Sequence, residues 1–257
     1  ELESTILNGS IGRDGHFVLT TGEHGYRSAA AVYDTAGKEV FKYRSSEYYM
    51  VTAVLSPDCK TLAALGFRQN GITLESHVLF FDVSSGKQYA DAVLSDSLGV
   101  ALTYSENGAA AVLCDNGLFR VTRKGDTEQL LELSAQDLVA STTQPDRMAL
   151  AIRSYQNGAR CDLYTVRGGT LHGPFALAEE PSTLAFSNAG TAVLSAAGVS
   201  VYSTAGQPQW HNTDAVGAHR VLMTDDGTVF LLYNKNARIF TAHSTQSEEL
   251  YPDEQYQ

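Results

Sequence analysis

The chain has 257 residues, of which 43% are hydrophobic and 18% are charged, and its formal net charge is −11. This composition supplies enough apolar side chains for a sizeable core. The acidic balance excludes nucleic acid as a partner, because binding to phosphates needs a basic face, and the lack of any apolar run of about 18 or more residues excludes a transmembrane helix within this sequence.

Two turn signals alternate along the chain. The first is a tight polar turn after an apolar run, and it recurs at Asp14-Gly15, Asp58-Cys59, Asn107-Gly108, Asp146-Arg147, Ala189-Gly190 and Asp226-Gly227. The second is a glycine turn that closes an aromatic or aliphatic run, and it recurs at Gly37, Gly86, Gly125, Gly169 and Gly206. Successive polar turns are 37 to 49 residues apart. Repeats of this length with four short strands each are typical of β-propeller blades.

Each repeat is predicted to run as strand A, polar turn, strand B, loop, strand C, glycine turn and strand D. In the second repeat the expected strands cover residues 51–55, 61–65, 77–82 and 88–93. No segment has a sustained apolar pattern of helical period, so the predicted fold is all-β, a propeller of four-stranded antiparallel blades. Length favours six blades, with seven as the alternative, in one domain over residues 1–257, with blades at about 4–45, 48–94, 98–133, 137–178, 181–213 and 217–251. The sixth repeat lacks its turn glycine near 242–246, and residues 248–251 are expected to form the last strand D.

The B-to-C loops vary in length, whereas the rest of the repeat does not. From the second residue of each polar turn to its own glycine turn the chain takes 16 to 27 residues, but from each glycine turn to the next polar turn it takes 21 or 22. Because strands alternate in direction, the B-to-C loops and the D-to-A connections share one face. Variable loops on a rigid scaffold usually carry function, so this face is the predicted binding face.

Three long loops, residues 22–27, 68–75 and 155–160, and the connection 47–49 bring aromatic and guanidinium groups to that face. Such groups are enriched at protein interfaces. If the second loop is a hairpin extension, Ile72 and Leu74 are exposed at its tip. The simpler interpretation is that Asn-Gly only makes a turn and the loops are tolerated extensions. The candidate binding residues are Tyr26, Arg27, Tyr48, Tyr49, Arg68, Asn70, Ile72, Tyr155, Asn157 and Arg160.

The sequence contains no recognised catalytic motif, cofactor motif or metal motif. The Gly-x-Ser-x-Gly pentapeptide of serine hydrolases does not occur. The cluster 225–227 is better explained as a turn than as a calcium loop, which needs more oxygen ligands, and His211 and His219 have no partner at metal-ligand spacing. Cys59, Cys114 and Cys161 fall in different strands and turns, so we expect free thiols.

Three segments, residues 32–41, 81–87 and 201–210, resemble the repeat of quinoprotein-type propellers, in which an aliphatic-Tyr/Leu-Asp pair, a short turn, Gly-Lys and Trp close each blade. Only Trp210 keeps the tryptophan, and Phe41 and Tyr89 occupy the comparable places. The Ser-Pro-Asp and Ser-Glu-Asn-Gly turns resemble those of WD-repeat and TolB-like propellers. These are scaffold residues, so the resemblance implies the propeller fold and says little about function. A quinoprotein dehydrogenase would need adjacent cysteines and eight blades, which this chain lacks.

The predicted function is therefore a non-enzymatic binding or scaffold propeller that recognises protein or peptide, without cofactor. The alternative is a carbohydrate or small-ligand binder, or a hydrolase, that works in the central channel lined by the A strands. The organisation is similar to uncharacterised surface propellers of Gram-positive bacteria, which implies an extracytoplasmic or cell-surface location, with a cytoplasmic location as the alternative. The first residue, Glu1, is not Met, and contact with a membrane is expected only through an upstream anchor outside this sequence.

Overall fold

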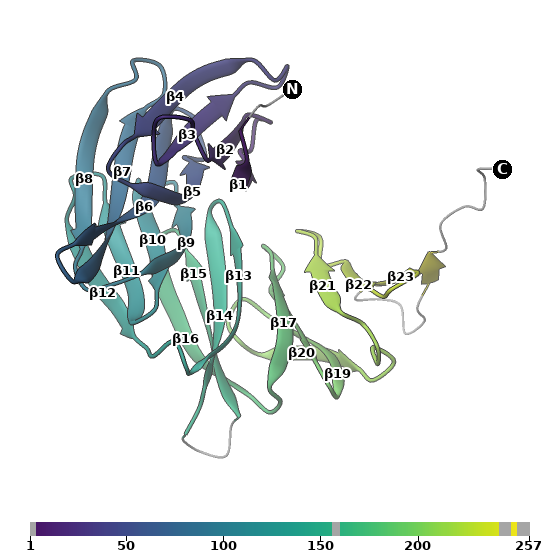
Figure 1. Cartoon of the computed structure of the whole chain (residues 1–257). Coiled ribbons are helices and arrows are strands. Elements are labelled where there is room, and N and C mark those ends of the chain that lie inside the picture. The colour runs from purple at the N-terminus through teal and green to yellow at the C-terminus, as the bar shows by residue number, and fades with distance from the viewer. Residues whose placement is uncertain (1–3, 156–159, 242–247, 251–257) are drawn as a thin grey trace. The chain divides into compact units, whose positions relative to one another are not determined.

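The computed structural model describes residues 4–155, 160–241 and 248–250. Over these residues every regular element is a β-strand (Figure 1), and no helix in this part of the chain could cross a membrane. The all-β prediction is confirmed. The chain divides into two compact units, an N-terminal unit of Glu1–Ala135, Thr143–Arg147 and Val166–Thr170 and a C-terminal unit of Gln136–Thr142, Met148–Thr165 and Leu171–Gln257.

The first three four-stranded antiparallel sheets belong to the N-terminal unit, and each follows chain order. The first contains β1 (Ile6–Ile11), β2 (Phe17–Thr21), β3 (Ser28–Tyr33) and β4 (Glu39–Ser45). The second contains β5 (Tyr49–Leu55), β6 (Thr61–Asn70), β7 (Thr73–Asp82) and β8 (Gln88–Leu94). The third contains β9 (Gly99–Tyr104), β10 (Ala109–Cys114), β11 (Gly117–Thr122) and β12 (Thr127–Glu132).

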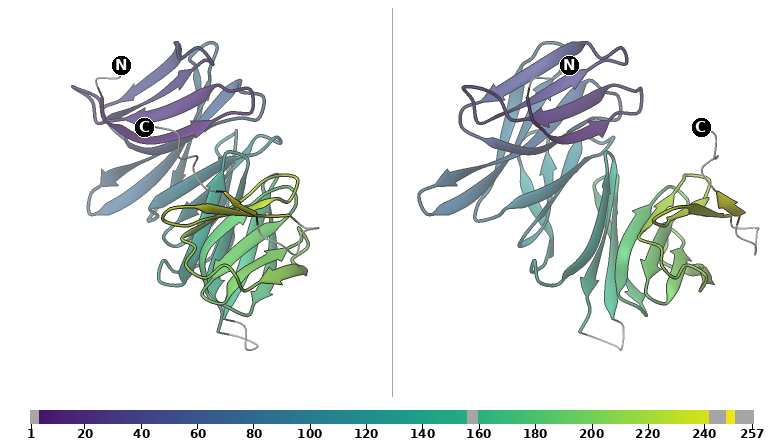
Figure 2. Two further views of the ribbon diagram at one scale, coloured as in Figure 1. Left: turned by 90° about the vertical axis from the view of Figure 1, so that its right-hand side faces the viewer. Right: turned by 45° about the vertical axis from the view of Figure 1, so that its right-hand side comes forward.

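The remaining three sheets have the same topology (Figure 2). The fourth, which contributes residues to both units, contains β13 (Leu138–Gln144), β14 (Arg147–Arg153), β15 (Cys161–Arg167) and β16 (Thr170–Leu177). The fifth contains β17 (Pro181–Phe186), β18 (Thr191–Ser195), β19 (Gly198–Tyr202) and β20 (Pro208–Asn212). The sixth contains β21 (Arg220–Met223), β22 (Val229–Leu232), β23 (Ala237–Phe240) and β24 (Glu248–Leu250). Strand β24 agrees with the expected last strand, whereas residues 242–246 and Tyr251 lie outside the described residues.

The glycines of the predicted turns have the positive φ that tight turns require. Gly37 has a φ of 80° and Gly86 a φ of 71°, in the left-handed region that side chains disfavour. A carboxylate closes each of these turns: Asp34 Oδ1 accepts the backbone N–H groups of Ala36 and Lys38, and Asp82 Oδ1 accepts that of Ser85. Local hydrogen bonds therefore stabilise these two turns.

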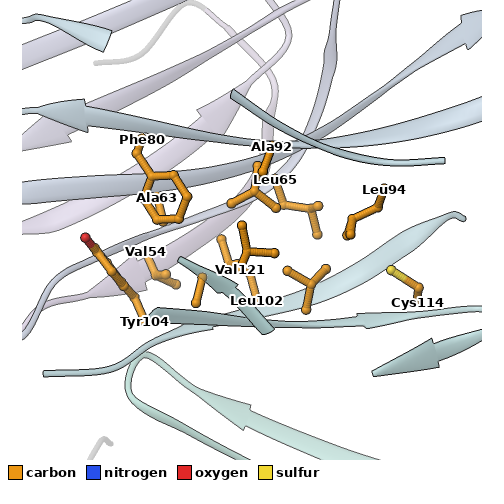
Figure 3. Packing of buried hydrophobic residues seen from close by; sticks show 13 residues of the cluster. Val54, Ala63, Leu65, Phe80, Ala92, Leu94, Leu102, Tyr104, Cys114 and Val121 are labelled. Carbon is orange, nitrogen blue, oxygen red and sulfur yellow. The ribbon is translucent and has the colours of Figure 1, made fainter. Parts of the chain in front are cut away.

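Within the N-terminal unit the core lies between neighbouring sheets, because the central strands are buried on both faces. On β6 and β7, Ala63 and Phe80 pack toward the third sheet, beside Leu102 and Tyr104 (Figure 3). The alternate residues of the same strands, such as Leu79, pack toward the first sheet. Because both faces of these strands are buried, the B and C strands are continuous apolar runs and do not alternate between apolar and polar residues. Phe80 and Tyr104 are fully buried and meet edge to face with ring centroids 5.7 Å apart.

The three cysteines are free thiols, as expected. Cys114 and Cys161 are buried within strands β10 and β15. Cys59 is half-buried in its turn, and its φ of 55° is unusual for a residue with a side chain. Burial, followed by a hydrogen bond with the Asp14 carboxylate, raises the pKa of Cys59 to about 11. A thiol of this kind is packed into the turn and is mostly protonated at neutral pH.

Candidate binding surface on the β6–β7 hairpin

The B-to-C loop of the second sheet is a rigid extension of two strands. Strands β6 and β7 pair without interruption from Thr61↔Asp82 to Asn70↔Thr73. Their outer neighbours stop earlier: β5 begins opposite Phe67 and β8 ends opposite Ser76. Residues 68–75 therefore project beyond the sheet as a two-stranded hairpin, which is the condition under which Ile72 and Leu74 were expected to be exposed. Gly71, with a φ of 62°, takes the first central position of its two-residue turn.

Side chains of the hairpin alternate between two faces. One face carries Phe67 and Leu74, and Tyr49 of β5 lies directly opposite Phe67. Their rings stack with centroids 5.4 Å apart, and the Arg27 guanidinium lies over the Tyr49 ring, 4.8 Å from its centroid. We call Tyr49, Phe67 and Leu74, together with Ile72 at the tip, the hairpin apolar face.

The hairpin apolar face is open to solvent. Ile72 is 101% exposed, and Tyr49 and Leu74 are 45% and 41% exposed. Tyr26, on the neighbouring β2–β3 loop, is 46% exposed. A gathering of exposed apolar side chains on a rigid element is a mark of an interaction surface, whereas isolated exposed apolar residues are ordinary.

The opposite face of the hairpin is polar and internally paired. Glu75 accepts hydrogen bonds from Asn70 Nδ2 at 2.7 Å and from Arg68 Nε at 3.4 Å, and Arg68 also pairs with Glu47. The Arg68 guanidinium lies 5.8 Å from the centroid of the Tyr48 ring. The two contacts of Glu75 cross the hairpin and hold its strands in register, whereas Glu47 and Tyr48 join Arg68 to the segment before β5.

At the base of this face three side chains are joined by hydrogen bonds: Tyr48 and His77 are buried, whereas the Asp91 side chain is 34% exposed. His77 is 1% exposed and its Nδ1 lies 2.7 Å from Asp91 Oδ1, while the Tyr48 hydroxyl donates to Asp91 Oδ2 at 3.0 Å. Because a carboxylate only accepts hydrogen bonds, the Nδ1 of His77 carries the proton. Its Nε2 is buried, has no hydrogen-bond partner among the residues that the structure describes, and lies 3.8 Å from Glu75 Oε2. We call Tyr48, Arg68, Glu75, His77 and Asp91 the polar network.

The network stabilises its charged carboxylates. Burial alone would raise the pKa of Asp91, but hydrogen bonds from His77 and Tyr48 and the charge of Arg68 outweigh burial and hold that pKa below its ordinary value. Hydrogen bonds from Asn70 and Arg68 likewise lower the pKa of Glu75. Burial, and then the Asp91 charge, raises the pKa of the Tyr48 phenol. Asp91 and Glu75 are therefore ionised at neutral pH.

Because these pKa values are lowered in the folded chain, we expect the free energy of unfolding to decrease in acid. The pKa values of Asp91 and Glu75 are lower in the folded than in the unfolded chain, where they are about 3.9 and 4.3, so the unfolded chain binds protons first as pH falls. Their contribution is complete above about pH 5 and is lost as pH falls below about 4. Urea unfolding at pH 5 and pH 3 measures the loss, and Asp91→Asn should show a smaller one. An equal loss in the two proteins would contradict this account.

The structure places the other candidate residues as follows. Tyr48 is 6% exposed, so the expectation that it adds to the exposed surface is wrong: Asp91 and the His77 ring, 4.6 Å between centroids, hold it inside. Tyr155 and Arg160 belong to the C-terminal unit, where the Tyr155 hydroxyl donates to Asp137 and Arg160 lies 3.8 Å from Glu179. Asn157 lies outside the described residues.

Sequence reasoning missed Phe67, Glu75, His77 and Asp91 as members of this site. One signal was present: Glu75 and His77 are two apart on a strand, so they share a face. The pairing of Arg68 opposite Glu75 depends on the register of the hairpin, which the structure supplies. Asp91 had no such signal, because its contact with His77 depends on the register of β8 against β7.

A second feature is a cavity of about 460 Å³ on the first strands of the sheets in the N-terminal unit. Strands β1, β5, β9 and β13 line it, with apolar side chains such as Val54 and Leu102. Its polar lining is uncharged and comes from Asn8, Ser10, Thr52, Thr143 and Gln144. The volume is in the range of small-molecule sites. Among the described residues, no group of three or more His, Cys, Asp or Glu side chains could hold a metal ion.

Comparison with known proteins identifies a family and a fold. A model described as a family of unknown function, DUF5711, matches residues 1–239. No curated protein matches the chain in sequence. Solved structures that resemble it are β-propellers. Hsv2 of Kluyveromyces lactis, with loop 6CD replaced by a Gly-Ser linker, is 11% identical, with a TM-score of 0.65 over 98% of this chain and 84% of that chain.

Two further propellers are similar at the same level. The Dos1 propeller is 12% identical, with a TM-score of 0.62 over 97% of this chain and 71% of that chain. The propeller domain of the Trilobed protease from Pyrococcus furiosus, described as having an open velcro topology, is 13% identical, with a TM-score of 0.59 over 97% of this chain and 85% of that chain. At such identities the likeness shows the propeller fold alone.

Proposed function

The chain belongs to DUF5711, a family of unknown function, and we propose that it is a β-propeller, with the six sheets as its blades, that binds a protein or peptide through the hairpin apolar face. The observation that carries this proposal is the contrast between the two faces of one hairpin. On the polar face Glu75 and Asp91 pair with Asn70, Arg68, Tyr48 and His77, whereas the apolar face leaves Ile72 and Leu74 in water.

Rigidity supports this function. Ordering a flexible loop on binding costs free energy, and a hairpin whose strands are already paired avoids that cost. Ten residues of β6 pair with ten of β7 up to the turn, and Arg68 and Asn70 bind Glu75 across it. The exposed apolar surface of this hairpin therefore has its shape before a partner binds, and binding does not have to form it.

The test is to shorten the hairpin. Replacement of residues 68–75 by Asn-Gly joins Phe67 to Ser76, which are already opposite each other, so the sheet below keeps its register. Crosslinking capture from source cells with the intact chain and with the shortened chain then compares the same scaffold with and without the apolar tip. We expect a protein that the intact chain captures and the shortened chain loses. Equal capture by the two chains would refute the proposal.

The second candidate function is binding of a neutral small ligand, including a glycan, in the cavity on the first strands. Its support is the 460 Å³ volume and the lining of hydroxyl, amide and apolar groups without charge. Comparison of the intact and shortened chains also distinguishes the two candidate functions, because the cavity residues lie outside the segment that is removed. A ligand of the cavity should bind the shortened chain as tightly as the intact chain.

A further inference from the structure

The charged side chains beside the hairpin apolar face indicate the chemistry of a partner that would fit it. Four basic side chains lie on the β2–β3 loop, the adjoining part of β4 and the hairpin: Arg27, Lys42, Arg44 and Arg68. Lys42 and Arg44 both pair with Glu23, at 2.9 and 3.1 Å, and Arg68 pairs with Glu47 and Glu75. Three of the four are thus neutralised within the protein.

Arg27 differs from these three. Within the part of the chain that the structure describes, no carboxylate lies within ion-pair distance of its guanidinium, which rests on the Tyr49 ring. The Tyr49 ring attracts the guanidinium through its π electrons and so orients it. The ring offers no oxygen acceptors, so it does not satisfy the five N–H donors of the guanidinium. An arginine of this kind, exposed and stacked on an aromatic ring, matches the geometry of a carboxylate.

We propose that Arg27 and the hairpin apolar face together bind a protein segment in which one carboxylate is flanked by apolar side chains. The inference rests on the proposed function and adds the chemistry of the partner. Arg27 supplies a paired hydrogen-bond donor for the carboxylate, and the Tyr49–Phe67 stack and Leu74 supply the adjoining apolar contact. A polyacidic run does not fit, because the chain carries a net charge of −11 that repels it at long range.

The test uses two peptides that differ only in charge, Ac-Leu-Glu-Phe-NH2 and Ac-Leu-Gln-Phe-NH2, titrated into the full chain. NMR signals of the Arg27 side-chain N–H and the Tyr49 ring report binding at the site. We expect the Glu peptide to bind about threefold to tenfold more tightly, as for a partly exposed charge-assisted hydrogen bond. Arg27→Gln should remove this difference. Arg44→Gln, which changes an arginine already paired with Glu23, should keep it.

Three results overturn the inference: equal affinity for the two peptides, a preference for Glu that survives Arg27→Gln, or no shift at Arg27 and Tyr49 with either peptide. The first result is distinguishable from failure of the proposed function. If both peptides bind equally and Leu74→Asp weakens both, the hairpin apolar face is a binding surface and only the carboxylate assignment fails. If neither peptide shifts these signals but the intact chain still captures a protein that the shortened chain loses, the partner has different chemistry.

Discussion

Replacement of Asp91 with alanine is expected to lower the free energy of unfolding by about 2 to 4 kcal/mol. Asp91 accepts the only hydrogen bonds that the described structure gives to His77 Nδ1 and to the Tyr48 hydroxyl, and both residues are less than 10% exposed. The substitution leaves two buried donors without an acceptor, and each such group costs about 1 to 3 kcal/mol. Urea unfolding at pH 7 measures the change.

The control is an acidic residue whose ion pair is exposed. Glu128 pairs with Arg120 and is 56% exposed, so Glu128→Ala should change the free energy of unfolding by less than about 1 kcal/mol. Asp91→Asn keeps one acceptor and should fall between the alanine variant and the parent. If Asp91→Ala were no more destabilising than Glu128→Ala, the polar network would not support the hairpin.

The largest expected effect on binding follows Leu74→Asp. Leu74 is 41% exposed on the hairpin apolar face, so a carboxylate there is tolerated by the fold but places a desolvated charge against an apolar partner. We expect capture of the protein partner to fall at least about tenfold, as for an interface residue worth more than about 1.4 kcal/mol. The free energy of unfolding should change by less than about 0.5 kcal/mol.

Val40→Asp provides the matched control. Val40 is 43% exposed on β4, away from the hairpin, and the same change of chemistry is made at the same exposure. It should leave capture of the partner unchanged. An equal loss in both variants would indicate that added negative charge, and not the hairpin apolar face, determines binding.

Much of the fold could be predicted from the sequence because its signals are local. The expected strands of the second sheet, 51–55, 61–65, 77–82 and 88–93, lie within β5 to β8, and the turn glycines such as Gly86 have the positive φ that their position requires. A hairpin turn near Gly71 was also predictable, because Asn-Gly is a strong turn signal, but the structure places Gly71 and Ile72, not Asn70 and Gly71, at the centre of the turn. The exposure of Ile72 follows from that turn.

The site was less predictable, because its contacts join residues that are far apart in the sequence. Tyr48 and Tyr49 are adjacent and chemically alike, yet Tyr48 is buried against His77 and Tyr49 is exposed under Arg27. Which of the two turns inward depends on the placement of Asp91, 43 residues away. No periodic pattern carries that information, since a D-to-A connection has neither the strand period nor a fixed turn type.

The most direct test of the account is site-specific photocrosslinking from the hairpin tip. A photoreactive amino acid at Ile72, which is 101% exposed, is compared with the same group at Val216, which is 76% exposed in the C-terminal unit. One protein should crosslink from position 72 but not from position 216, and Leu74→Asp should abolish the product. Products that are the same from both positions, or that survive Leu74→Asp, would contradict recognition by the hairpin apolar face.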